Sequence, residues 1–220
     1  MSVPLLNERA KERITEYNQN PCCGQRYNPA AKVVYQATRR FVDPFEPQFE
    51  PYIIFGLGQF DMGRTMVAEF PNRLHCSLEN LRKTTLLGKL RACCLSSADL
   101  SAYGSEIMSA YELLARTGTL HPTKQFHVGA TKILHWLFPD LFLMLDRNVA
   151  RAFRKHFGVK LRDTTQPGYS AQIYLSCLRS AQNEILSFGT DRFRQLEPDS
   201  PEARIFDKIA FVVGVRLKVQ

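Results

Sequence analysis

The stretch "LFPDLFLMLDRNVARAFRKHFG", Leu137 to Gly158, contains the sharpest change of character in this chain. It is almost entirely apolar as far as Leu145, and four basic residues follow Asp146 within nine positions. Pro139 ends the helical pattern before it, so the apolar run predicts a buried connector that brings Asp146 to the edge of the core. Gly158 is typical of a helix end. The stretch therefore predicts a helix, a buried connector and a second helix.

The helix after Asp146 has two opposite faces on a helical wheel. One face is apolar and consists of Val149, Phe153 and Phe157. The other is basic and consists of Arg147, Arg151, Arg154 and Lys155. Such a basic face contacts either solvent, as on any soluble helix, or the phosphates of a nucleic acid. The net charge of +8 and the isoelectric point near 9.3 favour a polyanionic partner, and we expect DNA.

Length and composition predict one compact domain over residues 1–220, because 45% hydrophobic residues in 220 can form one substantial core. The start, "MSVPLLNERAKERITEY", has no apolar core of signal-peptide length. The longest apolar stretch, Ile133 to Leu145, is interrupted and too short to span a membrane. We therefore expect a soluble, intracellular protein, cytoplasmic or nuclear, without membrane association. The sequence does not indicate an oligomeric state.

The remaining pattern is mostly helical, so the expected fold class is all-α, a compact multi-helix domain. Amphipathic or capped segments are found over residues 4–17, 30–41, 80–95, 96–117, 128–138, 170–188 and 200–214. A Pro/Gly-rich arm near 42–64 contains too many helix breakers for a helix and predicts an extended arm. Its aromatic residues Phe41, Phe45 and Phe49 either pack onto the body or form a stacking platform for a peptide or base. Short strands are expected only around 51–57.

The six cysteines include two adjacent pairs, which do not match the spacing of zinc or thioredoxin-like sites. We interpret them as reduced thiols that pack as small apolar groups. A zinc site formed by Cys22, Cys23, His75 and Cys76 is the alternative. We expect no metal and no cofactor.

Asp146 and the helix before it contain the candidate chemical groups. An Asp directly before a helix accepts hydrogen bonds from first-turn amides and stabilises the helix by about 1 kcal/mol. The same position also favours an ionised carboxylate that can stabilise positive charge. Over residues 128–138, Thr131, Lys132 and His135 share a polar face. We expect His135 to be a surface or hydrogen-bonded histidine rather than a catalytic one.

The segment "HVGATKILHWLFPDLFLMLDRNVARAF" resembles a compressed form of the helix-hairpin-helix region of base-excision DNA glycosylases. Asp146, Asn148, Val149 and Arg151 match the family's D-T-H-V-x-R element, and residues 128–129 match its hairpin. The resemblance covers about 30 of the 220 residues. It departs from the family in having one hairpin glycine instead of two and a shorter segment between Lys132 and Asp146.

The resemblance implies a helix-hairpin-helix-like fold and a DNA N-glycosylase, with or without lyase activity. The target base would be flipped out of the stack. Asp146 would support cleavage of the base–sugar bond, and Lys132 would be the Schiff-base nucleophile. Nucleic-acid contacts are then expected from Gly129, Thr131, His135, Arg147, Asn148, Arg151, Arg154 and Lys155. The alternative is a non-catalytic helical protein with a DNA-binding, protein-interaction or structural role.

Overall fold

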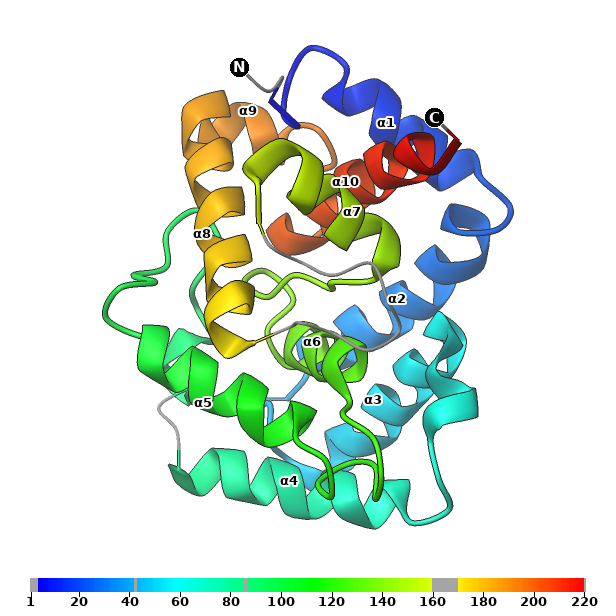
Figure 1. The fold of residues 1–220 in the computed structure, drawn as a ribbon, viewed down its shortest axis with the longest axis vertical. Helices are drawn as coiled ribbons and strands as arrows, with labels where there is room; N and C mark the ends of the chain where they lie inside the picture. Colours follow the sequence, from blue (N-terminus) through cyan, green and yellow to red (C-terminus); the bar gives the residue numbers. More distant parts are fainter. Residues whose placement is uncertain (1–3, 42, 85–86, 160–169, 220) are drawn as a thin grey trace.

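A computed structural model describes residues 4–41, 43–84, 87–159 and 170–219. Within these ranges the chain forms α-helices and short 3₁₀ or π turns and no strand, which confirms the expected all-α class (Figure 1). The helices are α1 (Ala10–Gln19), α2 (Gly24–Thr38), α3 (Glu50–Leu57), α4 (Phe70–Thr84), α5 (Gly104–Ala115), α6 (His127–Leu137), α7 (Arg147–Phe157), α8 (Ala171–Phe188), α9 (Thr190–Arg194) and α10 (Glu202–Val219).

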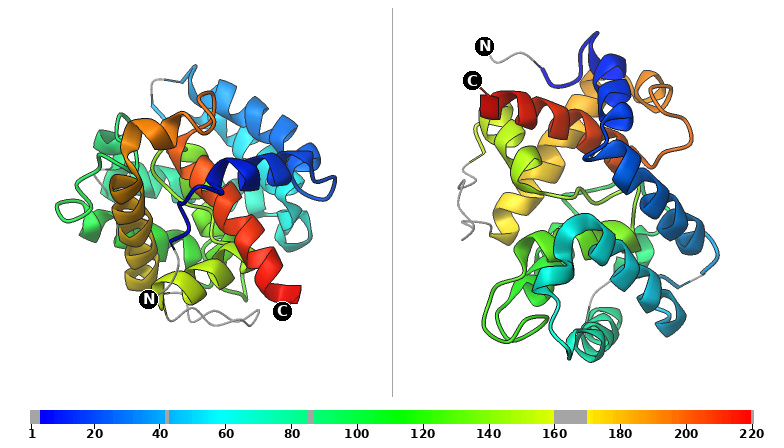
Figure 2. Two further views of the ribbon diagram at one scale, coloured as in Figure 1. Left: turned by 90° about the horizontal axis from the view of Figure 1, so that it is seen from above. Right: turned by 90° about the vertical axis from the view of Figure 1, so that its right-hand side faces the viewer.

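The helices form two groups. The first group, α1, α7, α8, α9 and α10, gathers at one end of the molecule, and α3, α4, α5 and α6 lie toward the other end (Figures 1 and 2). Helix α2 leads from the first group to the second, and α5 packs on both α6 and α8. Most of the buried apolar residues join into one hydrophobic cluster that includes both groups.

Helix α10 crosses α7 at very short range. A Cβ atom added to Gly214 of α10 would lie 1.8 Å from the carbonyl oxygen of Asn148 in α7, so only glycine fits at this position. Helix α1 also packs on α10. These contacts fix α10 beside the start of α7, where Asp146 lies.

The predicted connector between α6 and α7 is confirmed. Phe142, Leu143, Met144 and Leu145 lie in no helix or strand and are at most 4% exposed. Buried backbone groups need hydrogen-bond partners, and a connector without helix or sheet must find them elsewhere. Side chains from three helices supply them. Two donate to backbone carbonyls: His135 Nδ1 to O of Phe142 (2.6 Å) and Tyr174 Oη to O of Leu143 (3.0 Å). Two accept from backbone amides: Asp207 Oδ2 from N of Met144 (3.0 Å) and Thr131 Oγ1 from N of Leu145 (3.1 Å).

Helix α7 forms as the wheel predicts. Asp146 is its N-cap, and Gly158 ends it in the left-handed conformation with φ 63°. Val149 and Phe153 are buried, and Phe157 is partly buried against the core. The apolar stripe therefore anchors α7 and leaves its basic side chains toward the surface.

The expectation for residues 42–64 is wrong in one respect. The segment contains a 3₁₀ turn (η1, Pro47–Phe49), α3, a π turn (η2, Gly58–Met62) and a second 3₁₀ turn (η3, Gly63–Thr65), with no strand near 51–57. Pro47 and Pro51 do not prevent this, because each lies in the first turn of its helix, where no intrahelical N–H bond is lost, and Pro44 lies in the turn before η1.

The aromatic residues of this arm do pack onto the body as expected. Phe45 and Phe49 are buried in the main cluster, and Phe41 packs against it. Buried rings are not available to an external peptide or base, so the stacking-platform alternative is wrong for Phe45 and Phe49.

The boundaries of the first helices also differ from the expected ones. Helix α1 begins at Ala10 rather than near residue 4, and α2 begins at Gly24 and includes Pro29.

In the described ranges no helix is both long enough and apolar enough to cross a lipid bilayer.

Candidate active site

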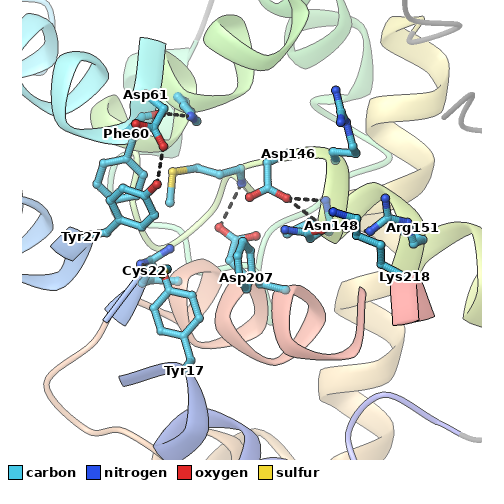
Figure 3. A pocket seen from close by; sticks show the side chains of 16 residues that line it. Tyr17, Cys22, Tyr27, Phe60, Asp61, Asp146, Asn148, Arg151, Asp207 and Lys218 are labelled. Carbon is cyan, nitrogen blue, oxygen red and sulfur yellow. Dashed lines mark hydrogen bonds between the residues drawn. The ribbon is translucent and has the colours of Figure 1, made fainter. Parts of the chain in front are cut away.

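A cavity of about 550 Å³ lies between the two groups of helices (Figure 3). Its volume is in the range of pockets that hold small organic ligands. It is lined by Tyr17, Cys22, Tyr27, Phe60, Asp61, Lys132, Met144, Asp146, Arg147, Asn148, Val149, Arg151, Arg204, Asp207, Phe211 and Lys218. Both residues expected to be catalytic, Lys132 and Asp146, are among them.

Asp146 caps α7 and faces the cavity at the same time. Its Oδ1 accepts from the backbone amides of Asn148 (2.8 Å) and Val149 (2.9 Å), which confirms the cap. Among the described residues no hydrogen bond reaches Oδ2, so one oxygen serves the helix and the other remains available. Burial raises the pKa of this carboxyl group, while the two amides and the charge of Lys132 oppose the rise.

Lys132 places a desolvated amine in the same cavity. The residue is 7% exposed, and its Nζ donates to the carbonyl oxygen of Phe60 at 2.5 Å. Burial lowers the pKa of the amine to about 8, and the charges of Asp146 and Asp61 partly offset this. The amine forms no direct ion pair with Asp146, although each group shifts the pKa of the other. A substantial fraction of the amine is therefore neutral near pH 8.

Aromatic rings and a strained turn form the wall beside Lys132. The Tyr27 ring stacks on Phe60, with centroids 4.7 Å apart and planes 23° apart. The Tyr27 hydroxyl and Arg26 Nη2 both donate to Asp61. Asp61 has φ 62°, and it is the one non-glycine residue in the described ranges with positive φ. Unusual backbone of this kind and π turns are enriched at functional sites.

Helix α10 contributes four residues at helical spacing, Arg204, Asp207, Phe211 and Lys218. Arg204 donates from Nη2 to the Tyr17 hydroxyl at 2.6 Å. Asp207 is 2% exposed, and burial raises its pKa well above the ordinary value. Its Oδ2 accepts from the amide of Met144, whereas the buried Oδ1 has no hydrogen-bond partner.

The expected site did not include Asp61, Arg204 or Asp207. The sequence does contain a signal for Arg204 and Asp207, because both are charged residues inside the apolar run "ARIFDKIAFVVG". A charged residue on a helix that is buried on all sides usually has a specific partner or function. For Asp61 the sequence gave only a breaker-rich turn.

Cations dominate the cavity. Of the residues that the structure describes, five with cationic side chains and three with carboxyl groups line it. Arg147 and Lys218 are exposed, and Arg151 is half-buried, donating to Oδ1 of Asn148 (2.9 Å) and to the carbonyl oxygen of Gly214 (3.1 Å). This balance favours an anionic ligand.

The expected nucleic-acid contacts divide into two sets. Arg147, Asn148 and Arg151 line the cavity. Arg154 and Lys155 lie further along α7, half-buried and exposed, and do not line it.

Gly129, Thr131 and His135 lie elsewhere and require a correction. Gly129 is in the first turn of α6, not in a hairpin, and the Phe126 ring fills the space beside it. Thr131 and His135 are 1% and 0% exposed because their side of α6 faces the buried connector. Burial lowers the pKa of His135 to about 3, so the ring is neutral, and it also bonds the Tyr35 hydroxyl at 2.7 Å. From these positions the three residues cannot contact DNA, but Thr131 and His135 position the connector that carries Asp146.

The residues of the alternative zinc site do not come together. No group of three or more His, Cys, Asp or Glu side chains in the described ranges could hold a metal ion. His75 instead bonds Glu50 at 2.8 Å, and Cys22 lines the cavity.

Comparisons with protein-family models, with curated proteins and with solved structures found no match to this chain. The cavity is thus defined by its own chemistry: an amine with a lowered pKa, a carboxylate at a helix N-terminus, stacked rings and surrounding cations.

Proposed function

We propose that this protein is a DNA N-glycosylase that removes a base from its deoxyribose, with Lys132 as the nucleophile and Asp146 as the supporting carboxylate. One observation carries the proposal. The amine of α6 and the cap of α7, which lie apart in the sequence, converge on one cavity without neutralising each other in a direct ion pair. A separated amine and carboxylate can act on an atom placed between them.

Lys132 has the protonation behaviour that a nucleophilic amine needs. An ordinary lysine is almost fully charged at neutral pH, and only the neutral amine can attack carbon. With a pKa of about 8, the Lys132 amine is partly neutral under physiological conditions. Its bond to the Phe60 carbonyl holds Nζ at the cavity wall.

Asp146 has two tasks in this reaction. Its Oδ1 remains on the α7 amides, while Oδ2 stabilises the positive charge that develops on the sugar and accepts the proton that the amine loses. The cap interpretation and the catalytic interpretation of this residue are therefore compatible.

The rest of the cavity fits a flipped nucleotide. Its volume of about 550 Å³ is sufficient for one base and its sugar. The stacked Tyr27 and Phe60 rings offer apolar surface to a base, and Arg147, Arg151 and Lys218 offer cations to the flanking phosphates.

Base release from damaged duplexes tests this function. The protein and an Asp146→Asn variant are incubated with duplexes that contain uracil, hypoxanthine, 8-oxoguanine, ethenoadenine or 7-methylguanine. We expect release from at least one duplex and a loss of about 100-fold or more in the variant. Asp99→Asn is the matched control, because Asp99 Oδ1 also accepts two backbone amides but lies on the surface away from the cavity.

A salt titration separates this function from the non-catalytic alternative. A glycosylase that holds phosphates loses DNA affinity steeply as salt rises, and it also releases a base. Salt-sensitive binding without release from any duplex favours a DNA-binding module. Binding that does not respond to salt contradicts a DNA partner.

A further inference from the structure

Asp207 is a buried carboxyl group in the cavity to which the proposed function gives no role. It is 2% exposed, and its carboxyl group lies opposite that of Asp146 (Figure 3). Oδ2 accepts from the Met144 amide at 3.0 Å, and Oδ1 is buried with no hydrogen bond. A buried oxygen without a partner costs stability, and a native protein retains one mainly where it has a task.

The surroundings of Asp207 favour its neutral acid form. An ionised carboxylate needs donors on both oxygens, and here only one backbone amide is present. The charged and titratable groups that face it are Arg204 on its own helix, Asp146 on the connector, Tyr35 of α2 and Tyr174 of α8. Arg204 favours the ionised form, but burial and the charge of Asp146 oppose it, and burial is the largest effect.

The two carboxyl groups of the cavity are therefore unequal. Asp146 accepts two amides at a helix N-terminus and feels the charge of Lys132, so it is the one that ionises first. In Asp207 the unbonded Oδ1 is the oxygen that can carry a proton, because Oδ2 accepts from the Met144 amide. Paired carboxyl groups with different environments are a common basis for acid and base roles.

We propose that Asp207 is the general acid that protonates the departing base, an inference that rests on the proposed glycosylase function. The C1′–N bond breaks and its electron pair stays with the departing base. The base takes the proton from Asp207 Oδ1. The Lys132 nitrogen forms the new bond to C1′ and gives its proton to Asp146. Asp207 ends as a carboxylate and Asp146 as an acid, so protons and electrons balance without another reactant.

This role also narrows the substrate class. A neutral base leaves poorly as an anion and needs the acid, whereas a base that already carries a positive charge leaves as a neutral molecule. The cavity thus fits uncharged bases with an acceptor atom that can reach Asp207, and hypoxanthine is one such base.

An Asp207→Asn variant tests the inference because the amide can still accept from Met144 but cannot give up a proton. Single-turnover base release is measured from pH 5 to 9 on the duplex with a neutral base that the wild type cleaves fastest, and on a 7-methylguanine duplex. We expect a loss of at least about 100-fold on the neutral base and less than about 10-fold on 7-methylguanine. The decline of the wild-type rate at alkaline pH is expected to disappear in the variant, and Asp207→Glu is expected to restore part of the rate. Duplex affinity and melting temperature are measured alongside and should not fall.

The outcomes separate the two proposals. A wild type that releases no base from any duplex overturns both. A wild type that is active beside an equally active Asp207→Asn variant overturns the role of Asp207 and leaves the proposed function in place. An equal loss on neutral and cationic bases indicates a structural role and also overturns the inference.

Discussion

Two buried lysines in this protein have similarly lowered pKa values, but one is paired with a carboxylate and the other is not. Lys132 of α6 and Lys208 of α10 are 7% and 3% exposed, and burial lowers the pKa of each to about 8. Lys208 donates to both carboxylate oxygens of Glu197, at 2.7 and 2.8 Å. Lys132 donates to one backbone carbonyl and faces a cavity, with Asp146 near but not in a direct ion pair.

The difference teaches how function can be distinguished from architecture when both bury a charge. In a buried lysine that is paired, as Lys208 is, the partner carboxylate offsets part of the cost of desolvation within the fold. A buried amine that is held apart from its carboxylate lowers stability, and proteins keep such groups mainly where activity depends on them. We therefore propose that Lys132 belongs to a reactive site, whereas the ion pair with Glu197 assigns Lys208 to the scaffold.

The largest expected difference between the two lysines is in base release. Lys132→Met removes the proposed nucleophile, and we expect the single-turnover rate to fall by about 1,000-fold or more. Lys208 lies outside the cavity. The rate of base release by Lys208→Met should therefore stay within about 10-fold of wild type at a temperature where the variant is folded. Equal losses in the two variants would show that Lys132 has no special role.

For the free energy of unfolding we expect the opposite order, with the larger loss in Lys208→Met. Lys208→Met leaves the Glu197 carboxylate partly buried without its cation, and we expect a loss of about 3 kcal/mol in the free energy of unfolding. Lys132→Met removes a charge that burial disfavours, and the loss should not exceed about 1 kcal/mol. Urea denaturation at pH 7 measures both. Lys132→Met as unstable as Lys208→Met contradicts the comparison.

The stability contributed by Lys132 depends on pH in a defined direction. The pKa of its amine is about 8 in the folded protein and 10.5 in the unfolded chain, so the unfolded chain binds more protons between these values. The free energy of unfolding therefore rises with pH across this window, by up to about 3 kcal/mol for this lysine. Lys132→Met should lose this rise, as measured by urea denaturation near pH 7.5, 9 and 10.5. A variant with the same pH dependence as wild type contradicts the lowered pKa.

The smallest expected effect concerns the support of Asp146. Thr131→Val removes the hydroxyl that accepts the Leu145 amide, and leaving that buried N–H without a partner should cost about 1 kcal/mol in the free energy of unfolding. Base release should also slow, because the connector that positions Asp146 loses a bond. Thr15→Val, which removes an exposed hydroxyl bond to the Lys11 carbonyl, is the control and should change stability by less than about 0.5 kcal/mol.

The sequence predicted the centre of this molecule well because local chemistry dictates it. An apolar run after Pro139, a capping Asp146 and a terminal Gly158 each have one dominant structural consequence, and all three are found. The apolar stripe of α7 followed from helical spacing alone. Only the direction in which this stripe faces depends on the rest of the fold.

The wrong predictions have their causes in the tertiary structure. Thr131 and His135 form a polar face, but the polar groups that they serve belong to the buried connector, so the face points inward. Pro47 and Pro51 break a helix when they lie in its interior, but their position in a first turn makes them compatible with helices. Asp207 entered the site because α10 crosses α7 at Gly214. Its charge within an apolar run indicates a buried role, but no local pattern indicates which distant helix it will face.

Covalent trapping tests the central claim most directly. The wild type, Lys132→Met and Lys208→Met are incubated with a reactive damaged duplex in the presence of borohydride, which reduces a protein–sugar imine to a stable bond, and the adduct is mapped by peptide mass spectrometry. We predict an adduct on Lys132 in the wild type and in Lys208→Met, and none in Lys132→Met. An adduct on another residue, an adduct that persists in Lys132→Met, or base release without any adduct would contradict Lys132 as the nucleophile.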